Sequence, residues 1–316
     1  MKATLPNIPS EKVPVGKDEK SNKVIFESKI KKRNAKVKPH WEILDKIVDE
    51  SASSTISGSR FVVYKDLGAV MMESLKNMMI DYHRSNGYTL YSAPVIVNTN
   101  ILYGTGQLPK FKDDLYQVEE DKYLIPTAEA TLTNIFREKI LDSSELPKKL
   151  VAYSNCFRKE AGASGKDTRG IKRLHQFNKV ELVHILEEKD DEKLLNEMLN
   201  SAIEIVKMLE LPYRVLSLST GELTFSSSIT YDIEVWMPGQ NEWMEISSVS
   251  SCSDFQGERI NTRTRDGEGK SFVYTHNGSG IAIDRAIAAI LENHQNEEGE
   301  INIPASLQKY MKVDKI

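Results

Sequence analysis

The sequence predicts an α+β domain, and two observations support this prediction. Residues 66–83 and 190–211 place apolar side chains at the spacing of an amphipathic helix. Residues 212–260, in contrast, are rich in β-branched and aromatic residues and contain the turn sequence Met-Pro-Gly-Gln at 237–240. A run of strands connected by turns, placed after the helices in the sequence, favours antiparallel pairing. It argues against a doubly wound parallel sheet.

Composition limits the classes of function. A chain of 316 residues, 40% of them hydrophobic, can bury a large core as one domain or two. The net charge of −4 gives no global basic field, so any contact with a polynucleotide must be a local patch. Cys156 and Cys252 lack metal-ligand spacing and favour buried thiols in a reducing compartment. With no apolar run of membrane-spanning length and no signal segment, we expect a cytoplasmic protein without membrane contact.

The first part of the chain predicts a lead-in, a helix and a strand. Residues 1–36 are rich in proline, lysine, serine and asparagine, which is typical of an extended segment. The helix at 66–83 has apolar positions at Met71, Leu75, Met78, Met79 and Tyr82. Gly87 stands where its C-terminal cap belongs, and TLYSAPVIVN predicts a strand containing Pro94. Such a helix is ordinarily packed inside a monomer.

Two polar stretches follow. The loop GTGQLPKF at 104–111 lacks the spacing of a Walker phosphate cradle, so its signal for phosphate is weak. In YLIPTAEATLTN, Thr127 and Glu129 are one residue apart, and a strand would aim both to one side. A hydroxyl and a carboxylate aimed together can hold the ammonium group of a small amino acid. The alternative is an exposed helix start, because Thr-x-Glu is also cap chemistry.

The segment 157–181 predicts a strand, a long polar hairpin loop and a return strand. Arg158 and Glu160 would share a face of the first strand. Arg173, Phe177 and Glu181 recur at intervals of four and would share a face of the second. Two arginines, two acids and an aromatic ring suit a nucleoside triphosphate. A surface hairpin with a solvated charged tip is the alternative.

The last part of the chain predicts a core helix, a pair of oxygen ligands and a possible anion site. The helix at 190–211 has apolar positions at Leu194, Met198, Ala202, Ile205 and Leu209 and ends before Pro212.

Glu245 and Ser248 are hard oxygen ligands that suit Mg²⁺, although an acid on a strand beside water is the simpler interpretation. YTHNGSGIAIDRAIAAILENHQ predicts a glycine-rich turn into a helix whose N-terminus can bind an anion. Asp284 excludes the dinucleotide fingerprint there.

These stretches resemble one family closely. FRKEAGASGKDTRG followed by RLHQFNKVEL is similar to motif 2 of class II aminoacyl-tRNA synthetases, and specifically of seryl-tRNA synthetases. The segment 66–98 resembles motif 1, which builds the dimer interface, and the segment 274–295 resembles motif 3. The resemblance implies a single class II catalytic domain over residues 1–316, a mainly antiparallel sheet flanked by helices, and a homodimer.

The implied activity is serine–tRNA ligation. ATP and Mg²⁺ would activate L-serine to seryl-adenylate, and the seryl group would pass to the 3′ end of tRNA(Ser). The implied ATP-binding residues are Arg158, Glu160, Arg173, Phe177, Glu245, Ser248 and Arg285. The implied catalytic residues are Arg158, Arg285 and Glu245, and the implied metal ligands are Glu245 and Ser248. The implied serine-binding residues are Thr127, Glu129, Glu181, Asn277 and Ser279.

Individual roles follow from the same resemblance. Arg158 would hold the α-phosphate, while Arg173 and Arg285 would hold the outer phosphates. Phe177 would stack on adenine and Glu160 would bind its amino group.

The family normally begins with a coiled-coil arm that grips tRNA, whereas the matching stretch starts here at Leu5. We therefore expect an arm-less form with a weakened hold on the acceptor end of tRNA. Its remaining basic patch would be Lys159, Lys166, Arg169 and Lys172. Two alternatives stay open, a paralogue that passes serine to a non-tRNA acceptor and a non-catalytic dimeric binding module.

Two residues depart from the family pattern next to the implied site. His276 stands in place of the usual leucine, and Asp284 in place of the usual glycine. We expect Asp284 to be tolerated. The simplest interpretation of His276 is a polar neighbour of the substrate that hydrogen bonds hold in place.

Overall fold

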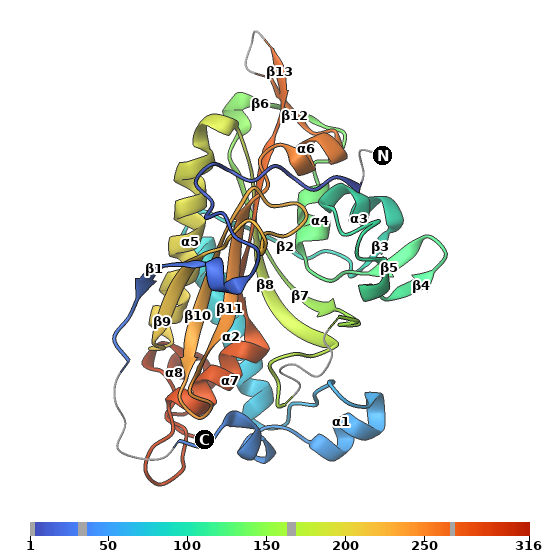
Figure 1. Cartoon of the computed structure of the whole chain (residues 1–316). Coiled ribbons are helices and arrows are strands. Elements are labelled where there is room, and N and C mark those ends of the chain that lie inside the picture. The colour runs from blue at the N-terminus through green and yellow to red at the C-terminus, as the bar shows by residue number, and fades with distance from the viewer. Residues whose placement is uncertain (1–3, 31–36, 163–168, 266–268) are drawn as a thin grey trace.

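A computed structural model describes residues 4–30, 37–162, 169–265 and 269–316 (Figure 1). Its centre is an eight-stranded sheet in the order β1-β9-β10-β11-β14-β8-β7-β2. These strands are β1 (Lys23–Glu27), β2 (Thr89–Tyr91), β7 (Lys148–Phe157), β8 (Gln176–Leu186), β9 (Tyr213–Ser217), β10 (Ile229–Met237), β11 (Glu242–Ser251) and β14 (Tyr274–Ala282). All neighbouring pairs are antiparallel except β2 and β7. The predicted α+β class is confirmed.

Two three-stranded sheets flank the central one. The first has the order β3-β5-β4, formed by Ile96–Asn98, Lys122–Leu124 and Gln117–Glu119. The second has the order β13-β12-β6, formed by Lys270–Phe272, Arg263–Arg265 and Ile140–Asp142. The single strand predicted at 89–98 is therefore wrong, because β2 and β3 lie in different sheets with Pro94 between them. Proline cannot donate to a ladder, which favours a break there.

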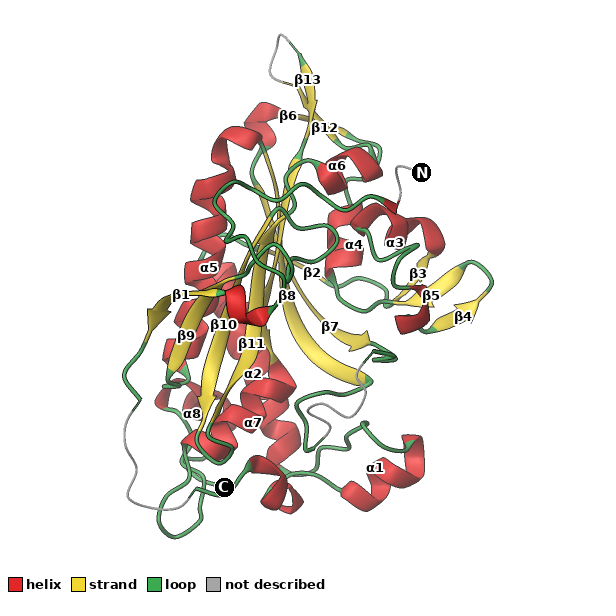
Figure 2. Cartoon of the chain, viewed as in Figure 1, coloured by secondary structure: helices red, strands yellow, loops and turns green. Residues whose placement is uncertain are grey.

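Four helices contribute to the main core (Figure 2). They are α2 (Leu67–Ser85), α5 (Asp191–Met208), α7 (Ile283–Asn293) and α8 (Ala305–Met311). Three pack directly against the central sheet, and the fourth, α8, packs on α2. The predicted apolar stripes of α2 and α5 are buried, with Tyr82 half-buried and Leu209 just beyond the end of α5. The α2 helix ends in a Schellman motif, in which Tyr88 N–H donates to the His83 carbonyl and Gly87 has a φ of 86°.

A second group of short helices lies near the β3-β5-β4 sheet, away from α5 and α8 (Figure 2). These helices are α3 (Thr99–Thr105), α4 (Glu129–Asn134) and α6 (Phe255–Ile260). The helix α6 corrects the prediction of strands throughout 212–260. The α-helix α1 (Glu50–Ser57) belongs to the segment before α2. No helix in the described ranges is long and apolar enough to cross a membrane.

Candidate active site

A polar cleft lies over β8, β10, β11 and β14 and has two adjoining lobes. The arginine lobe has a volume of about 270 Å³, and the large lobe has a volume of about 470 Å³. The lining residues common to both lobes are Asp114, Arg158, Lys179, Glu245 and Ser279. The two lobes are therefore parts of one continuous cleft.

The structure brings all of the predicted site residues to this cleft. The arginine lobe is lined by Arg158, Glu160, Arg173, Phe177, Glu245, Ser279 and Arg285. The large lobe is lined by Thr127, Glu129, Arg158, Glu181, Glu245, Ser248, Asn277 and Ser279. Apart from Ser248, the predicted ATP-binding residues line the arginine lobe. All predicted serine-binding residues line the large lobe.

The predicted hairpin is confirmed, but its strands are shorter than expected. β7 and β8 pair antiparallel, and alternation on β8 puts Phe177 and Glu181 on the cleft side. Arg158, Glu160 and Arg173 lie beyond the strand ends, and Glu160 has a φ of 53°. Their placement on strands is therefore wrong. They converge because the loop folds back, which leaves Arg173 Nε 3.5 Å from a Glu160 carboxylate oxygen.

Lys179 is a cleft residue that the sequence analysis missed. It lies midway between Phe177 and Glu181 on β8, so alternation alone could have found it. Its ammonium group pairs with the Glu181 carboxylate, and both side chains are buried. This cation offsets one negative charge in the large lobe.

Thr127 and Glu129 sit at the start of α4, so the predicted strand is wrong and the helix-start alternative is right. The Glu129 backbone N–H donates to Thr127 Oγ1 at 3.2 Å. The expected exposure is wrong, since both residues are buried and line the large lobe.

Glu129 is held by two amide side chains. Gln256 Nε2 and Asn277 Nδ2 donate to Glu129 Oε1 at 2.7 and 3.2 Å. Burial and, next, the charge of Glu181 raise the pKa of Glu129 to about 7. Gln256 comes from α6, and no local spacing in the sequence links it to Glu129. A cationic group in the large lobe would favour the ionised form of Glu129.

A β-bulge brings Glu245 and Ser248 to the same side of β11. Residues three apart on a regular strand face opposite sides. Here Ile233 pairs with Ser247 while Glu234 pairs with Glu245, which leaves one extra residue on β11. Both predicted metal ligands therefore line the cleft.

The charges around Glu245 suit a divalent cation. The charges of Arg285 and, next, Arg158 lower the pKa of Glu245, whose side chain is about half exposed. Opposite Ser248 on β10, the Asp232 Oδ1 atom is buried without a hydrogen-bond partner among the described residues. Burial and the charge of Glu245 raise the pKa of Asp232. Hard oxygen donors with an orphaned carboxylate oxygen fit Mg²⁺.

The same described residues contain no group of three or more His, Cys, Asp or Glu side chains arranged to hold a metal ion. A cation here would therefore take its other ligands from phosphate and water, as Mg²⁺ usually does.

The glycine-rich turn predicted within 274–295 is instead part of β14, which runs directly into α7. A Cβ on Gly278 would lie 2.8 Å from Met198 Sδ, and one on Gly280 would lie 2.9 Å from His83 Nε2. These glycines therefore allow the helices to pack closely on the sheet. Alternation turns Asn277 and Ser279 to the cleft.

Asp284 and His276 both have structural partners. Asp284 accepts from the Tyr64 hydroxyl at 2.7 Å and from Asn178 N–H at 2.6 Å, and burial raises its pKa. His276 is buried, lines neither lobe, and places Nε2 2.8 Å from an Asp191 carboxylate oxygen. His276 is held in place by a hydrogen bond, as expected, but it does not line the cleft as a neighbour of the substrate.

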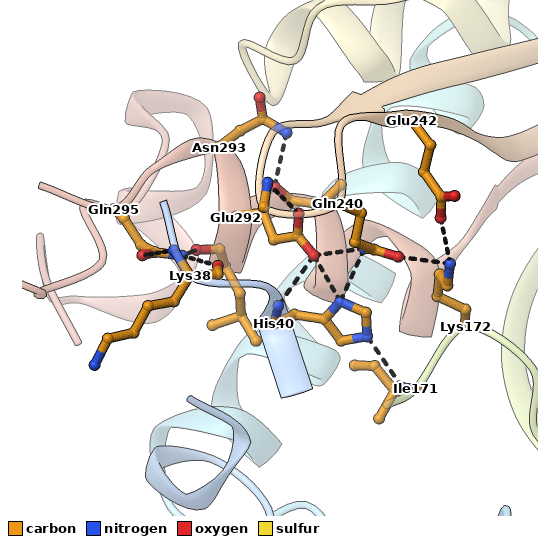
Figure 3. Close-up of polar contacts among 12 residues, drawn as sticks. Lys38, His40, Ile171, Lys172, Gln240, Glu242, Glu292, Asn293 and Gln295 are labelled. Carbon is orange, nitrogen blue, oxygen red and sulfur yellow. Dashed lines mark hydrogen bonds and ion pairs between the residues drawn. The ribbon is translucent and has the colours of Figure 1, made fainter. Parts of the chain in front are cut away.

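The predicted basic patch is only partly present. Lys159 and Arg169 are exposed, whereas Lys166 lies outside the described residues. Lys172 is buried and bonds Gln240 and Glu242 at 2.6 and 2.7 Å (Figure 3). Its inclusion in the patch is therefore wrong, because the Lys172 side chain is buried and its charge is already paired with the half-exposed Glu242 carboxylate.

Two loops complete the large lobe. Thr105, Gly106, Gln107 and Phe111 come from the stretch GTGQLPKF and lie on the side of the predicted serine-binding residues. Residues 222–226 contribute a second wall, which the sequence analysis did not anticipate. That segment carries no recognisable motif.

Comparison with known proteins assigns the family. The tRNA synthetase class II core domain (G, H, P, S and T) matches residues 110–294. The serine–tRNA ligase of Mesoplasma florum is 49% identical over 312 residues, covering 97% of this chain and 73% of the relative. That of Mycoplasmopsis agalactiae is 51% identical over 319 residues, covering 99% and 75%.

A solved structure agrees with this assignment. The crystal structure of seryl-tRNA synthetase from Pyrococcus horikoshii complexed with ATP superposes with a TM-score of 0.97 at 37% identity. The superposition covers 100% of this chain and 76% of that one. Family match, sequence identity and fold agree, and the chain therefore belongs to the serine–tRNA ligases, within the class II tRNA synthetases.

Proposed function

We propose that the arginine lobe binds ATP, that the large lobe binds L-serine, and that the two react to seryl-adenylate. The seryl group then passes to the 3′ end of tRNA(Ser). The observation that carries this proposal is the division of the predicted residues between two lobes that meet at Arg158, Glu245 and Ser279. A carboxylate bound in one lobe can therefore meet a phosphate bound in the other. The Pyrococcus horikoshii relative was solved with ATP, and a Naegleria fowleri relative with AMP.

In the large lobe, Glu129 and Glu181 bind the ammonium group of serine. Glu129 has a pKa of about 7 because it is buried beside Glu181, and a bound cation favours its ionised form. Thr127, Asn277 and Ser279 provide the polar groups for the remainder of the amino acid. A pocket with buried polar groups rejects alanine strongly, because those groups would lose their partners.

In the arginine lobe, Arg158 holds the α-phosphate, and Arg173 and Arg285 hold the outer phosphates. The Arg158 guanidinium lies 5.2 Å from the centre of the Phe177 ring, at the junction of the two lobes. The Phe177 ring stacks on adenine, and Glu160 accepts from its amino group.

Glu245 and Ser248 would hold Mg²⁺, which when bound neutralises negative charge on the phosphates. The serine carboxylate attacks the α-phosphorus, a new phosphorus–oxygen bond forms, and the bond to pyrophosphate breaks. The protein forms no covalent intermediate. Its part is to position both substrates and to stabilise the charge that shifts between the phosphates.

A homodimer through the segment 66–98 is part of the proposal. Val70, Leu90 and Ile96 in this segment are apolar and between 38% and 48% exposed, which suits a surface that a partner covers. Light scattering coupled to size-exclusion chromatography tests it, and a monomeric mass would refute it. We also propose a cytoplasmic location, which fits the two free, buried cysteines.

Serine-dependent exchange of pyrophosphate into ATP tests the activation step. We expect exchange with serine but not with threonine, alanine or glycine. Glu181→Ala should abolish it, whereas Glu197→Ala should not, because Glu197 pairs with Lys149 outside the cleft. Absence of exchange in folded protein would refute the proposal, and equal exchange with alanine would refute the serine pocket. Charging of tRNA(Ser) with labelled serine then tests the acceptor.

A further inference from the structure

A polar network with a buried centre lies beside the arginine lobe and joins four segments that are distant in the sequence (Figure 3). At its centre are His40 and Glu292, both fully buried. The Glu292 carboxylate lies 2.8 Å from His40 Nδ1 and also accepts from the His40 backbone N–H at 3.0 Å. A carboxylate only accepts, so Nδ1 carries the hydrogen of this bond.

The other ring nitrogen of His40 holds the return arm of the hairpin loop, residues 169–173. The Ile171 backbone N–H donates to His40 Nε2 at 3.3 Å, which requires a neutral imidazole with Nε2 as an acceptor. Gly170 has a φ of 69°, and a Cβ there would lie 2.1 Å from His40 Nε2. The arm thus lies directly against the ring, at a distance that only glycine permits.

The same arm is held from α7 by a second contact. Arg285 Nε donates to the Lys172 carbonyl at 3.1 Å. Glu292 lies on α7 as well, so this helix contacts two consecutive residues of the arm. The contact with Ile171 runs through His40, whereas the contact with Lys172 is direct. The next residue of the arm is Arg173, whose side chain lines the arginine lobe.

Gln240 adds a third link between Glu292 and the arm. Its amide nitrogen donates to Glu292 at 2.6 Å, and its amide oxygen accepts from the Lys172 ammonium group at 2.6 Å (Figure 3). Lys172 also pairs with Glu242 at 2.7 Å. Each of these groups shares a hydrogen-bond partner with the next. Loss of one side chain therefore weakens the hydrogen bonds of the others.

We propose that His40 is a positioning residue for ATP. Its imidazole, oriented by Glu292, fixes the position of the return arm. The arm in turn fixes the positions of the Arg173 and Arg285 side chains in the arginine lobe. None of His40, Gln240, Lys172 and Glu292 lines the large lobe, so the effect is confined to ATP and leaves serine binding alone. This inference rests on the proposed assignment of ATP to the arginine lobe.

Two substitutions at His40 separate its two hydrogen bonds. His40→Asn can place an amide nitrogen near the position of Nδ1 and keeps the bond to Glu292, but it leaves the Ile171 N–H without an acceptor. His40→Gln can place an amide oxygen near the position of Nε2 and keeps the bond to Ile171. We expect His40→Asn to raise the KM for ATP about tenfold, as for one buried donor left unpaired. We expect His40→Gln to raise it by no more than about twofold.

The readouts are the KM values for ATP and serine in pyrophosphate exchange, and calorimetric binding of ATP without serine. The KM for serine should stay unchanged in both variants. Gly170→Ala should reproduce the effect of His40→Asn, since it displaces the arm from the other side. His184→Asn is the matched control, because His184 is equally buried and bonds Tyr88 at 2.7 Å but lines neither lobe. It should lower the melting temperature and leave both KM values unchanged.

Equal KM values for ATP in His40→Asn and His40→Gln would overturn the inference. Parallel rises in the KM for ATP and the KM for serine would overturn it too. An unchanged KM for ATP in Gly170→Ala would also overturn it, even if the His40 variants do not fold. Failure of the wild-type protein to bind ATP would instead refute the proposed function.

Discussion

Near neutral pH, Glu129 should be divided between its charged and neutral forms, which makes serine use sensitive to pH. Burial and the charge of Glu181 raise its pKa from 4.5 to about 7. At about 1.4 kcal/mol per pKa unit, this rise is equivalent to about 3 kcal/mol of preference for the neutral acid. The ammonium group of serine needs the charged form, so serine binding and ionisation of Glu129 are linked.

The expected change can be measured by pyrophosphate exchange at saturating ATP. Roughly one tenth of Glu129 is ionised at about pH 6 and roughly nine tenths at about pH 8. The kcat/KM for serine should therefore rise about tenfold over this interval. In Glu129→Gln it should be lower by about one to two orders of magnitude, because a charged hydrogen-bond partner is lost, and it should not change with pH. A tenfold rise that persists in Glu129→Gln would assign the titration to another group and refute the reasoning.

The same titration should appear in the free energy of unfolding without ligand. Because the folded-state pKa is raised, the stability that neutral Glu129 contributes is fully present below about pH 4.5 and is lost as the pH rises through about 7. Between about pH 6 and about pH 8, the wild type should lose about 1.4 kcal/mol relative to Glu129→Gln. Urea denaturation at both pH values measures this difference, and a constant difference would show that the pKa is not raised.

Three further substitutions test nucleotide binding, metal binding and folding stability separately. Phe177→Ala should raise the KM for ATP about tenfold in pyrophosphate exchange without changing that for serine, because base stacking is lost, and equal rises would contradict this. Ser248→Ala should raise several-fold the Mg²⁺ concentration for half-maximal exchange, and an unchanged magnesium titration would exclude Ser248 as a ligand. Asp284→Asn should lower the free energy of unfolding by about 2 kcal/mol in urea, because one amide oxygen cannot replace both acceptors of Tyr64 and Asn178. An unchanged midpoint and slope of the urea denaturation curve would contradict this explanation.

Local patterns predicted much of the fold. The apolar stripes of α2 and α5, the hairpin turn at 237–240 and the β7–β8 hairpin depend on neighbours within a few residues in the sequence. Where a local signal had two outcomes, prediction was less secure. Thr127 and Glu129 fit both a strand and a helix start, and the helix formed.

The identities of the site residues were also available from the sequence, through the resemblance of the motifs to one family. Their geometry was not. Arg158, Glu160 and Arg173 reach the cleft from beyond the strand ends, where alternation no longer applies. Glu245 and Ser248 share a side only because of the bulge on β11.

By itself, the sequence determined the class of fold, the helical and strand faces, and the set of side chains that could hold ATP, a cation and an amino acid. Only the tertiary structure placed Gln256 against Glu129, 127 residues apart, and His40 against Ile171, 131 residues apart. The physical reason is that periodicity is set by adjacent residues, whereas such contacts depend on the register of the whole sheet and on the helices packed against it. The pKa of Glu129 and the proposed role of His40 both depend on those distant contacts.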